Sequence, residues 1–151
     1  RRAGRLHHIG QTERAADLYC EVAEEKTITV ALDHPEPVPL AVDAIRLGQA
    51  INNLLDNALK YTPAGGSVVL AVRRAPGGGA ELTVTDSGPG VAPAEREAIF
   101  RRLYRSDASR SQRGLGLGLS MVKAIVEAHR GTVVVDDAPG GGARFTVRLP
   151  A

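Results

Sequence analysis

The feature that most constrains this chain is one amphipathic stretch over residues 47–63, which reads LGQAINNLLDNALKYTP. With roughly 100° of rotation per residue in an α-helix, its apolar side chains form one stripe and its amides form another on a different side of the helix. The apolar stripe consists of Leu47, Ile51, Leu54, Leu55 and Ala58, and the polar stripe of Gln49, Asn53, Asn57 and Lys60. The sequence therefore predicts a helix with one face in a core and another face that carries amides and a cation.

Three asparagines make this helix less stable than it could be. Asn52, Asn53 and Asn57 together cost about 1.5 kcal/mol relative to alanines, because their side chains compete for backbone hydrogen bonds. This cost favours a role for their oxygens. Amide oxygens are hard ligands that Mg²⁺ accepts beside phosphate oxygens and water, and Lys60 lies one turn beyond Asn57, where it can meet phosphate charge. An exposed amide face without a ligand is the alternative interpretation.

Composition argues against several classes of protein. With 151 residues, 43% of them apolar, the chain is long enough for one domain with a core. A net charge of +2 and an aromatic content of 3% argue against a nucleic-acid partner. Cys20 is the only cysteine, which excludes an internal disulfide, and no apolar run reaches the roughly 18 residues of a membrane span. We expect no direct membrane contact by this chain.

Periodicity and turn signals predict helices and paired strands that segregate along the chain, so we expect an α+β sandwich with a mixed, mainly antiparallel sheet on one side and helices on the other. The predicted helices are 11–25, about 44–61 after an Asp43 N-cap, about 93–100, and 119–128 with Gly131 as the left-handed residue after its end. The predicted strands are 27–32, a short edge strand at 38–42, and the hairpin pairs 67–73 with 80–86 and 132–136 with 143–149. Residues 1–10 are expected to be irregular, and 101–113 to form a mobile, arginine-rich surface loop.

Asp86 ends a strand predicted to be central and is followed at once by Ser-Gly-Pro-Gly. A carboxylate at this point can accept the exocyclic amino protons of a purine, for which adenine is the natural partner. Gly88 and Gly90 would let the backbone approach a flat ring closely. The alternative is an Asx-type turn that only caps the strand.

Alternate glycines, Gly114, Gly116 and Gly118, precede the last predicted helix. Unpaired N–H groups and the helix dipole at such a start favour phosphate. The spacing is neither a dinucleotide fingerprint, since Leu119 and Met121 stand where the third glycine would be, nor a P-loop. The preceding loop carries arginines whose planar forks suit phosphate oxygens, although we expect most of them to be solvated. These are Arg101, Arg102, Arg105, Arg110 and Arg113.

In this order, the four features resemble the ATP-binding domain of sensor histidine kinases, in the superfamily that also contains the gyrase, Hsp90 and MutL ATPases. Residues 53–63 resemble the N box, 86–90 the G1 box, 99–105 the F box and 113–119 the G2 box. The resemblance extends from about Leu18 to the C-terminus. It implies a two-layer α/β sandwich of the Bergerat type with a mobile ATP lid over residues 18–151, and makes residues 1–17 an irregular or helical linker remnant.

The resemblance also implies roles for individual residues. Asn57 would hold Mg²⁺, Asn53 and Lys60 would position the phosphates, Tyr61 would lie against the adenine, and Asp86 would bind its amino group. The remaining ATP-binding residues implied by the family are Gly88, Gly90, Arg105, Gly114, Leu115, Gly116, Leu117, Gly118 and Leu119.

Three positions depart from the patterns of related proteins. Leu103 stands where the F box often has a second aromatic residue, and Arg113 where the G2 box often has glycine, which leaves the resting conformation of the lid open. Asn53 stands where the related ATPases have a glutamate that activates water, and an amide offers no basic lone pair. Hydrolysis should therefore be slow. A Ser/Thr-type protein kinase finds no support, because no H-R-D or D-F-G motif occurs.

The resemblance implies transfer of the γ-phosphate of Mg-ATP to a histidine on a separate dimerisation domain, for relay to a response regulator. Met121 is the only methionine and the chain opens with two arginines, so we expect a piece of a longer protein. That protein would be a sensor of the inner membrane with this domain in the cytoplasm. His7 and His8 lack the acidic-Leu-Arg-x-Pro context of the family's phosphorylated histidine. The alternatives are a stand-alone ATPase of the same superfamily and a degenerate nucleotide-binding interaction module.

Overall fold

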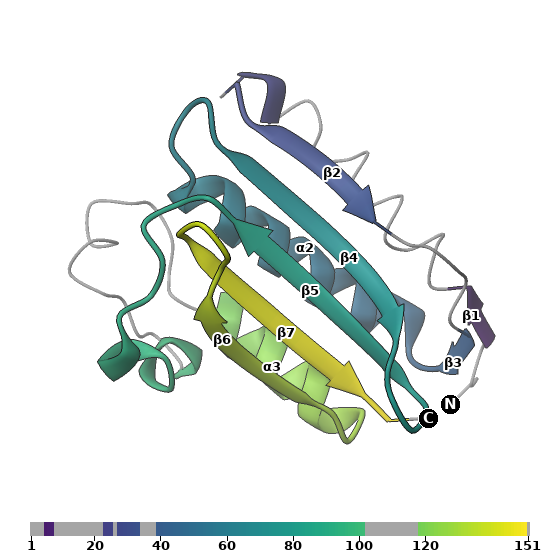
Figure 1. Ribbon diagram of the computed structural model, residues 1–151. Coiled ribbons are helices and arrows are strands. Elements are labelled where there is room, and N and C mark those ends of the chain that lie inside the picture. Colours follow the sequence, from purple (N-terminus) through teal and green to yellow (C-terminus); the bar gives the residue numbers. More distant parts are fainter. Residues whose placement is uncertain (1–4, 8–22, 26, 34–38, 102–117, 151) are drawn as a thin grey trace.

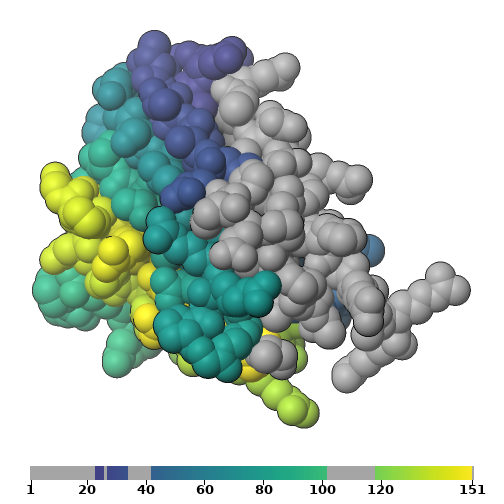
Figure 2. All heavy atoms as spheres, turned by 45° about the vertical axis from the view of Figure 1, so that its right-hand side comes forward, coloured from purple at the N-terminus to yellow at the C-terminus, as the bar shows by residue number. Residues whose placement is uncertain are grey.

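A five-stranded sheet forms one layer of the computed structural model, which describes residues 5–7, 23–25, 27–33, 39–101 and 118–150 (Figure 1). In spatial order its strands are β2 (Thr29–Asp33), β4 (Ser67–Arg74), β5 (Ala80–Asp86), β7 (Ala143–Leu149) and β6 (Thr132–Asp137). β2 and β4 are parallel, and the other neighbours are antiparallel. In Figure 2 the teal atoms of β4 and β5 separate the blue atoms of β2 from the yellow atoms of β7. The mixed, mainly antiparallel sheet with a central β5 is confirmed.

Two helices, α2 (Ala44–Tyr61) and α3 (Gly118–Ala128), lie against each other and cover one face of the sheet (Figure 1). The predicted N-cap is confirmed, because the Asp43 carboxylate accepts hydrogen bonds from the backbone N–H groups of Ile45 and Arg46 at 3.1 Å. No helix in the described part of the chain is both long and apolar enough to cross a membrane.

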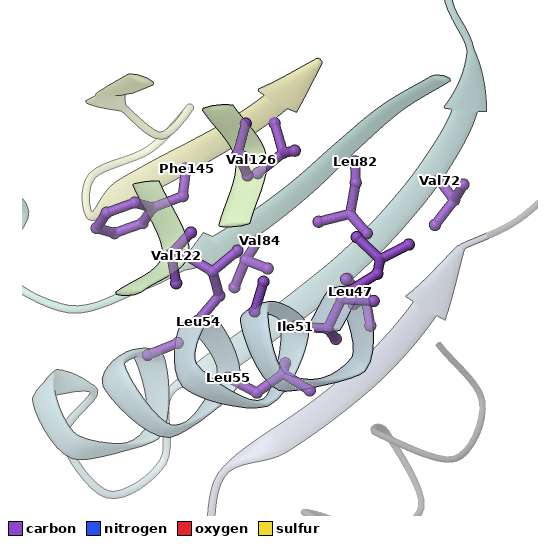
Figure 3. Packing of buried hydrophobic residues seen from close by; sticks show 14 of the residues in the cluster. Leu47, Ile51, Leu54, Leu55, Val72, Leu82, Val84, Val122, Val126 and Phe145 are labelled. Atoms are coloured by element: carbon purple, nitrogen blue, oxygen red, sulfur yellow. The ribbon is translucent and has the colours of Figure 1, made fainter. Parts of the chain in front are cut away.

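The core lies between the two layers, as Figure 3 shows. Ile51 and Leu54 of α2 are almost fully buried, and Val122 of α3 meets Val84 and Phe145 of the sheet in the same cluster. Burial of side chains of this size stabilises the fold by about 1.5–3 kcal/mol each. The apolar stripe that the sequence predicts on α2 is therefore the stripe that faces the sheet.

Several short segments differ from the prediction or lie outside the described residues. Within the segment expected to be irregular, β1 (Arg5–His7) pairs antiparallel with β3 (Pro39–Ala41), so the expected edge strand belongs to a separate two-stranded sheet. Three residues are too few to show a periodicity, which is why the pattern of residues 1–10 gave no strand. Of the helix predicted at 11–25, only 23–25 are described, and they are helical.

The expected helix at 93–100 is replaced by two single turns of 3₁₀-helix, η1 (Pro93–Glu95) and η2 (Ala98–Phe100). Each closes with an i to i+3 hydrogen bond, from the N–H of Arg96 to the carbonyl of Pro93 and from that of Arg101 to the carbonyl of Ala98. This tighter winding directs Phe100 into the core. The predicted loop at 101–113 lies outside the described residues from position 102 onward.

The end of α3 corrects the prediction for Gly131. Arg130, with φ 60°, is the left-handed residue, and Gly131 follows it. The N–H of Gly131 bonds to the carbonyl of Val126 and the N–H of Arg130 to that of Glu127, both at 2.9 Å, which is a Schellman motif. Gly131 is required for another reason: a Cβ atom there would overlap the backbone carbonyl of Arg148.

We expect Gly131→Ala to lower the free energy of unfolding by about 2 kcal/mol, because the carbonyl of Arg148 belongs to a paired strand and cannot move freely. Arg130→Gly should raise it by up to about 1 kcal/mol, since it relieves a side chain of a left-handed conformation. Urea unfolding followed by circular dichroism measures both. Equal destabilisation by the two changes would contradict this account of the helix end.

Candidate nucleotide-binding site

One residue of the polar stripe of α2, Asn53, contacts the start of α3. Asn53, Asn57 and Lys60 are half-buried. The side-chain amide of Asn53 donates to the backbone carbonyl of Gly118 at 3.4 Å, so the two helices meet at this point. The ammonium of Lys60 lies 3.9 Å from the carboxylate of Asp56, an exposed pair that contributes little to stability. Lys60 is thus held near the helix surface and can turn to another anion.

The turn that follows β5 packs against the last turn of α2. A Cβ atom on Gly88 would lie 2.8 Å from the carbonyl oxygen of Tyr61, so only glycine allows this approach. Ser87 connects the same turn to Ser67, the first residue of β4. The hydroxyl of Ser87 accepts a hydrogen bond from the N–H of Ser67 at 2.8 Å, and the N–H of Ser87 donates to the carbonyl of Ser67 at 3.0 Å. These contacts hold the turn after β5 in place against both the end of α2 and the start of β4.

Asp86 is the only carboxylate buried among the described residues, with 6% of its surface exposed. Its Oδ1 accepts two backbone hydrogen bonds, from Gly88 at 2.9 Å and from Ala143 at 3.2 Å. No described residue donates to Oδ2. Burial raises the pKa of this carboxyl above its usual range, and the two backbone N–H groups oppose the rise.

The glycines before β7 complete the support of Asp86. A Cβ atom on Gly142, which has φ 100°, would overlap the backbone carbonyl of Asp86. The carbonyl oxygen of Gly142 would in turn lie 3.1 Å from a Cβ atom on Gly90. The sequence indicated only a hairpin turn at 139–142 and gave no role to Ala143. A third glycine in a turn directly before a strand was the available signal for this close packing.

The segment from Asp86 toward residue 101 is anchored to the β6–β7 hairpin at two points. The guanidinium of Arg96 lies 2.9 Å from the carboxylate of Asp137 and donates to the carbonyl of Val91 at 3.3 Å. The rings of Phe100 and Phe145 meet edge to face, with centroids 6.1 Å apart. The sequence identified Phe100 only as part of a motif, without this partner.

The described residues of the predicted site lie at one end of the molecule, where α2 and β5 end and α3 begins (Figure 1). They are Asn53, Asn57, Lys60 and Tyr61 on α2, Asp86 on β5, Gly88 and Gly90 in the turn, and Gly118 and Leu119 on α3. Direct contacts join Asn53 to Gly118 and Tyr61 to Gly88. The remaining predicted residues, Arg105, Gly114, Leu115, Gly116 and Leu117, lie outside the described residues.

Residues 42–151 match the family of histidine kinase-, DNA gyrase B- and HSP90-like ATPases, and the chain belongs to this family. Its relatives within the family are sensor histidine kinases. It is 42% identical over 131 residues to the sensor histidine kinase TmoS of Ectopseudomonas mendocina, and the aligned region covers 85% of this chain and 14% of TmoS. It is 47% identical over 112 residues to the histidine-protein kinase/phosphatase MprB of Mycobacterium avium, and the aligned region covers 72% of this chain and 22% of MprB. The chain thus spans a minor part of these relatives.

Solved structures agree in fold. The mycobacterial sensor histidine kinase MprB has a TM-score of 0.84 and 33% identity, with 98% of this chain and 97% of that chain covered. Full-length ShkA, solved in complex with AMPPNP, has a TM-score of 0.86 and 34% identity, with 97% of this chain and 30% of that chain covered. The predicted fold is confirmed, and the chain is a catalytic domain of the sensor histidine kinase type.

The raised pKa of Asp86 gives a prediction for stability. Asp86→Asn should leave the free energy of unfolding at neutral pH unchanged or higher, because asparagine accepts the same backbone bonds without a buried charge. Since the folded pKa exceeds the unfolded value of about 3.9, the wild type loses stability relative to the variant as pH rises from below that value through the folded pKa. Urea unfolding from about pH 4 to pH 8 measures this difference.

Asp136→Asn is the matched control with the opposite sign. The side chain of Asp136 is hydrogen-bonded by the guanidinium of Arg144, which lowers the pKa of this carboxyl. The stabilisation from this aspartate is therefore present above the unfolded pKa and is lost as pH falls through the folded pKa. If both variants shifted stability in the same direction with pH, the burial argument for Asp86 would be wrong.

Proposed function

We propose that this domain binds Mg-ATP between α2, the turn after β5 and the start of α3, and transfers the γ-phosphate to a histidine of a separate dimerisation domain. The buried carboxylate of Asp86 is the observation that carries the proposal. A buried charge is costly unless it is paired, and Oδ2 has no donor among the described residues. The 6-amino group of adenine is a donor of the right kind for this oxygen.

Other groups near Asp86 fit the rest of the nucleotide. Tyr61 at the end of α2 is half-buried, and its backbone carbonyl lies against Gly88 in the turn that would support the base. In the proposal its ring would cover the adenine. Asn53 and Lys60 lie on the same face of α2 and would meet the phosphates as a hydrogen-bond donor and a positive charge. The start of α3 at Gly118 and Leu119 would offer backbone N–H groups to the same phosphates.

Asn57 would hold Mg²⁺ through its amide oxygen, one turn beyond Asn53 on the same face. In the residues that the structure describes, no three His, Cys, Asp or Glu side chains gather around a possible metal position. A single amide oxygen fits a Mg²⁺ ion whose other ligands are phosphate oxygens and water. When bound, the ion would neutralise charge on the β- and γ-phosphates.

Phosphotransfer fits this site better than hydrolysis. Asn53 has no basic lone pair with which to activate water, whereas a histidine of another domain is itself a nucleophile. The domain then needs only to position the triphosphate and stabilise its charge. A response regulator would receive the phosphoryl group next. The proposal places this domain in the cytoplasm, where ATP is supplied, as part of an inner-membrane sensor.

Asn57→Ala should weaken binding of a non-hydrolysable ATP analogue by at least about tenfold when Mg²⁺ is present, because the ion loses its protein ligand. Binding without Mg²⁺ should change little. The substitution raises helix propensity by about 0.5 kcal/mol, so a loss of binding is not explained by a weaker helix. Calorimetric titration with and without Mg²⁺ measures the effect.

Asn52→Ala is the matched control, since it removes another amide from a different side of the same helix. It should leave binding unchanged. Equal effects of Asn52→Ala and Asn57→Ala, or an unaltered affinity after Asn57→Ala, would contradict the assigned role of Asn57.

The transfer step is tested with radiolabelled ATP and a histidine-bearing helical hairpin from a related sensor kinase. We expect label on the hairpin when this domain is added and slow phosphate release when the hairpin is absent. Brisk phosphate release without a partner would favour the stand-alone ATPase. Nucleotide binding without any transfer to several such hairpins would favour an interaction module.

A further inference from the structure

We infer that His129 is a positioning residue, which fixes where α3 lies along α2 and thereby where the start of α3 would meet the phosphates. The inference rests on the proposed nucleotide site. Polar contacts join the two helices near both ends of α3. At its start the amide of Asn53 donates to the carbonyl of Gly118 at 3.4 Å, and after its end His129 accepts a hydrogen bond from the backbone N–H of Asp43 at 3.0 Å. The helices therefore run antiparallel, as Figure 1 shows, and are tied at two separate points.

The imidazole of His129 uses both of its ring nitrogens. Nε2 lies 3.0 Å from the backbone nitrogen of Asp43, which can only donate, so Nε2 accepts. Nδ1 lies 2.8 Å from the carbonyl oxygen of Ile125, which can only accept, so Nδ1 carries the hydrogen. Each bond thus requires the same tautomer, and together they fix the orientation of the ring.

On the side of α2, His129 supplies a partner that the helix itself lacks. In a capping box, the N–H of the N-cap residue is satisfied by a Glu or Gln side chain three residues later. Here that position is Arg46, whose guanidinium only donates. The other polar groups of Asp43 are engaged within α2, since its carboxylate caps the helix and its carbonyl accepts from the N–H of Leu47 at 2.9 Å. The acceptor for the remaining N–H therefore comes from the other helix.

On the side of α3, the backbone that carries His129 is anchored to the sheet. The Schellman motif closes around this residue, because the N–H of Gly131 bonds to the carbonyl of Val126 at 2.9 Å. Gly131 in turn lies so close to the carbonyl of Arg148 on β7 that a Cβ atom would overlap it. His129 thus links a fixed point of the sheet to the cap of α2.

Apolar packing by itself defines the position of α3 along its axis less well than its rotation. Val122, Ile125 and Val126 bury one face of α3, but contacts between apolar side chains are non-directional, whereas a hydrogen bond restricts both distance and angle. Packed helices can shift by about 1–2 Å relative to each other. Gly118 and His129 belong to one continuous helix and its cap, so a shift at His129 carries Gly118 with it.

Two substitutions separate the roles of the two ring nitrogens. The amide of glutamine reaches the place of Nε2 and can accept from the N–H of Asp43, whereas the shorter asparagine reaches only the place of Nδ1 and can donate to the carbonyl of Ile125. His129→Gln should therefore keep the link between the helices, and His129→Asn should lose it. Both variants carry the same polar group, so they form a matched pair.

The binding test compares a non-hydrolysable ATP analogue, given with Mg²⁺, and adenosine. His129→Asn should weaken binding of the analogue by roughly two- to tenfold, the range that one hydrogen bond supplies. It should leave binding of adenosine unchanged, because adenosine has no phosphate to meet α3. His129→Gln should bind both as the wild type does. Equal weakening of the analogue and adenosine, or equal losses in the two variants, would overturn the inference.

Heteronuclear NMR spectra without nucleotide test the positioning directly. His129→Asn should shift the backbone amide signals of Gly118 and Leu119 at the other end of α3, and His129→Gln should not. In the wild type, the ring signals of His129 should show hydrogen on Nδ1. Amide shifts confined to the neighbours of position 129, or a ring hydrogen on Nε2, would contradict the assigned role. If the wild type bound neither nucleotide nor adenosine, the proposed function would fail, while these spectra would still decide whether His129 positions α3.

Discussion

Burial of the apolar stripe of α2 between the sheet and α3 is the constraint on which the rest of this structure depends. Ile51 and Leu54 fix the rotation of the helix about its axis, because each is almost completely enclosed. Once that rotation is fixed, Asn53 and Asn57 have only one direction in which to project. The end of the same helix then sets the position of the turn after β5, through the contact of Tyr61 with Gly88.

The site combines groups that tolerate water with one group that does not. The amides and Lys60 on α2 are half-buried, so they keep part of their hydration until a ligand arrives. Asp86 is desolvated in advance, and its raised pKa is the measure of that cost. A carboxylate in this state gains more from a well-placed donor than an exposed one would, because its penalty has already been incurred in folding.

Local signals were sufficient for most of the fold and for part of the site. The Asp43 cap, the period of α2 and the glycine-rich turns of both hairpins depend on neighbours within a few residues, and all three are confirmed. The contact of Ala143 with Asp86 joins residues 57 positions apart, and no local pattern encodes it. Arg130 as the left-handed residue of α3 was missed because glycine is the usual choice there, while Gly131 serves close packing against β7.

The edge-to-face contact of Phe100 with Phe145 has a mechanical consequence. Phe145 belongs to β7, two residues after the backbone group that orients Asp86, and Arg96 ties the same stretch to the end of β6. The end of the sheet that carries Asp86 and the chain leading toward residue 101 are therefore tied together. A force applied at Phe100 would reach Asp86, through β7, by a shorter path than the amides of α2.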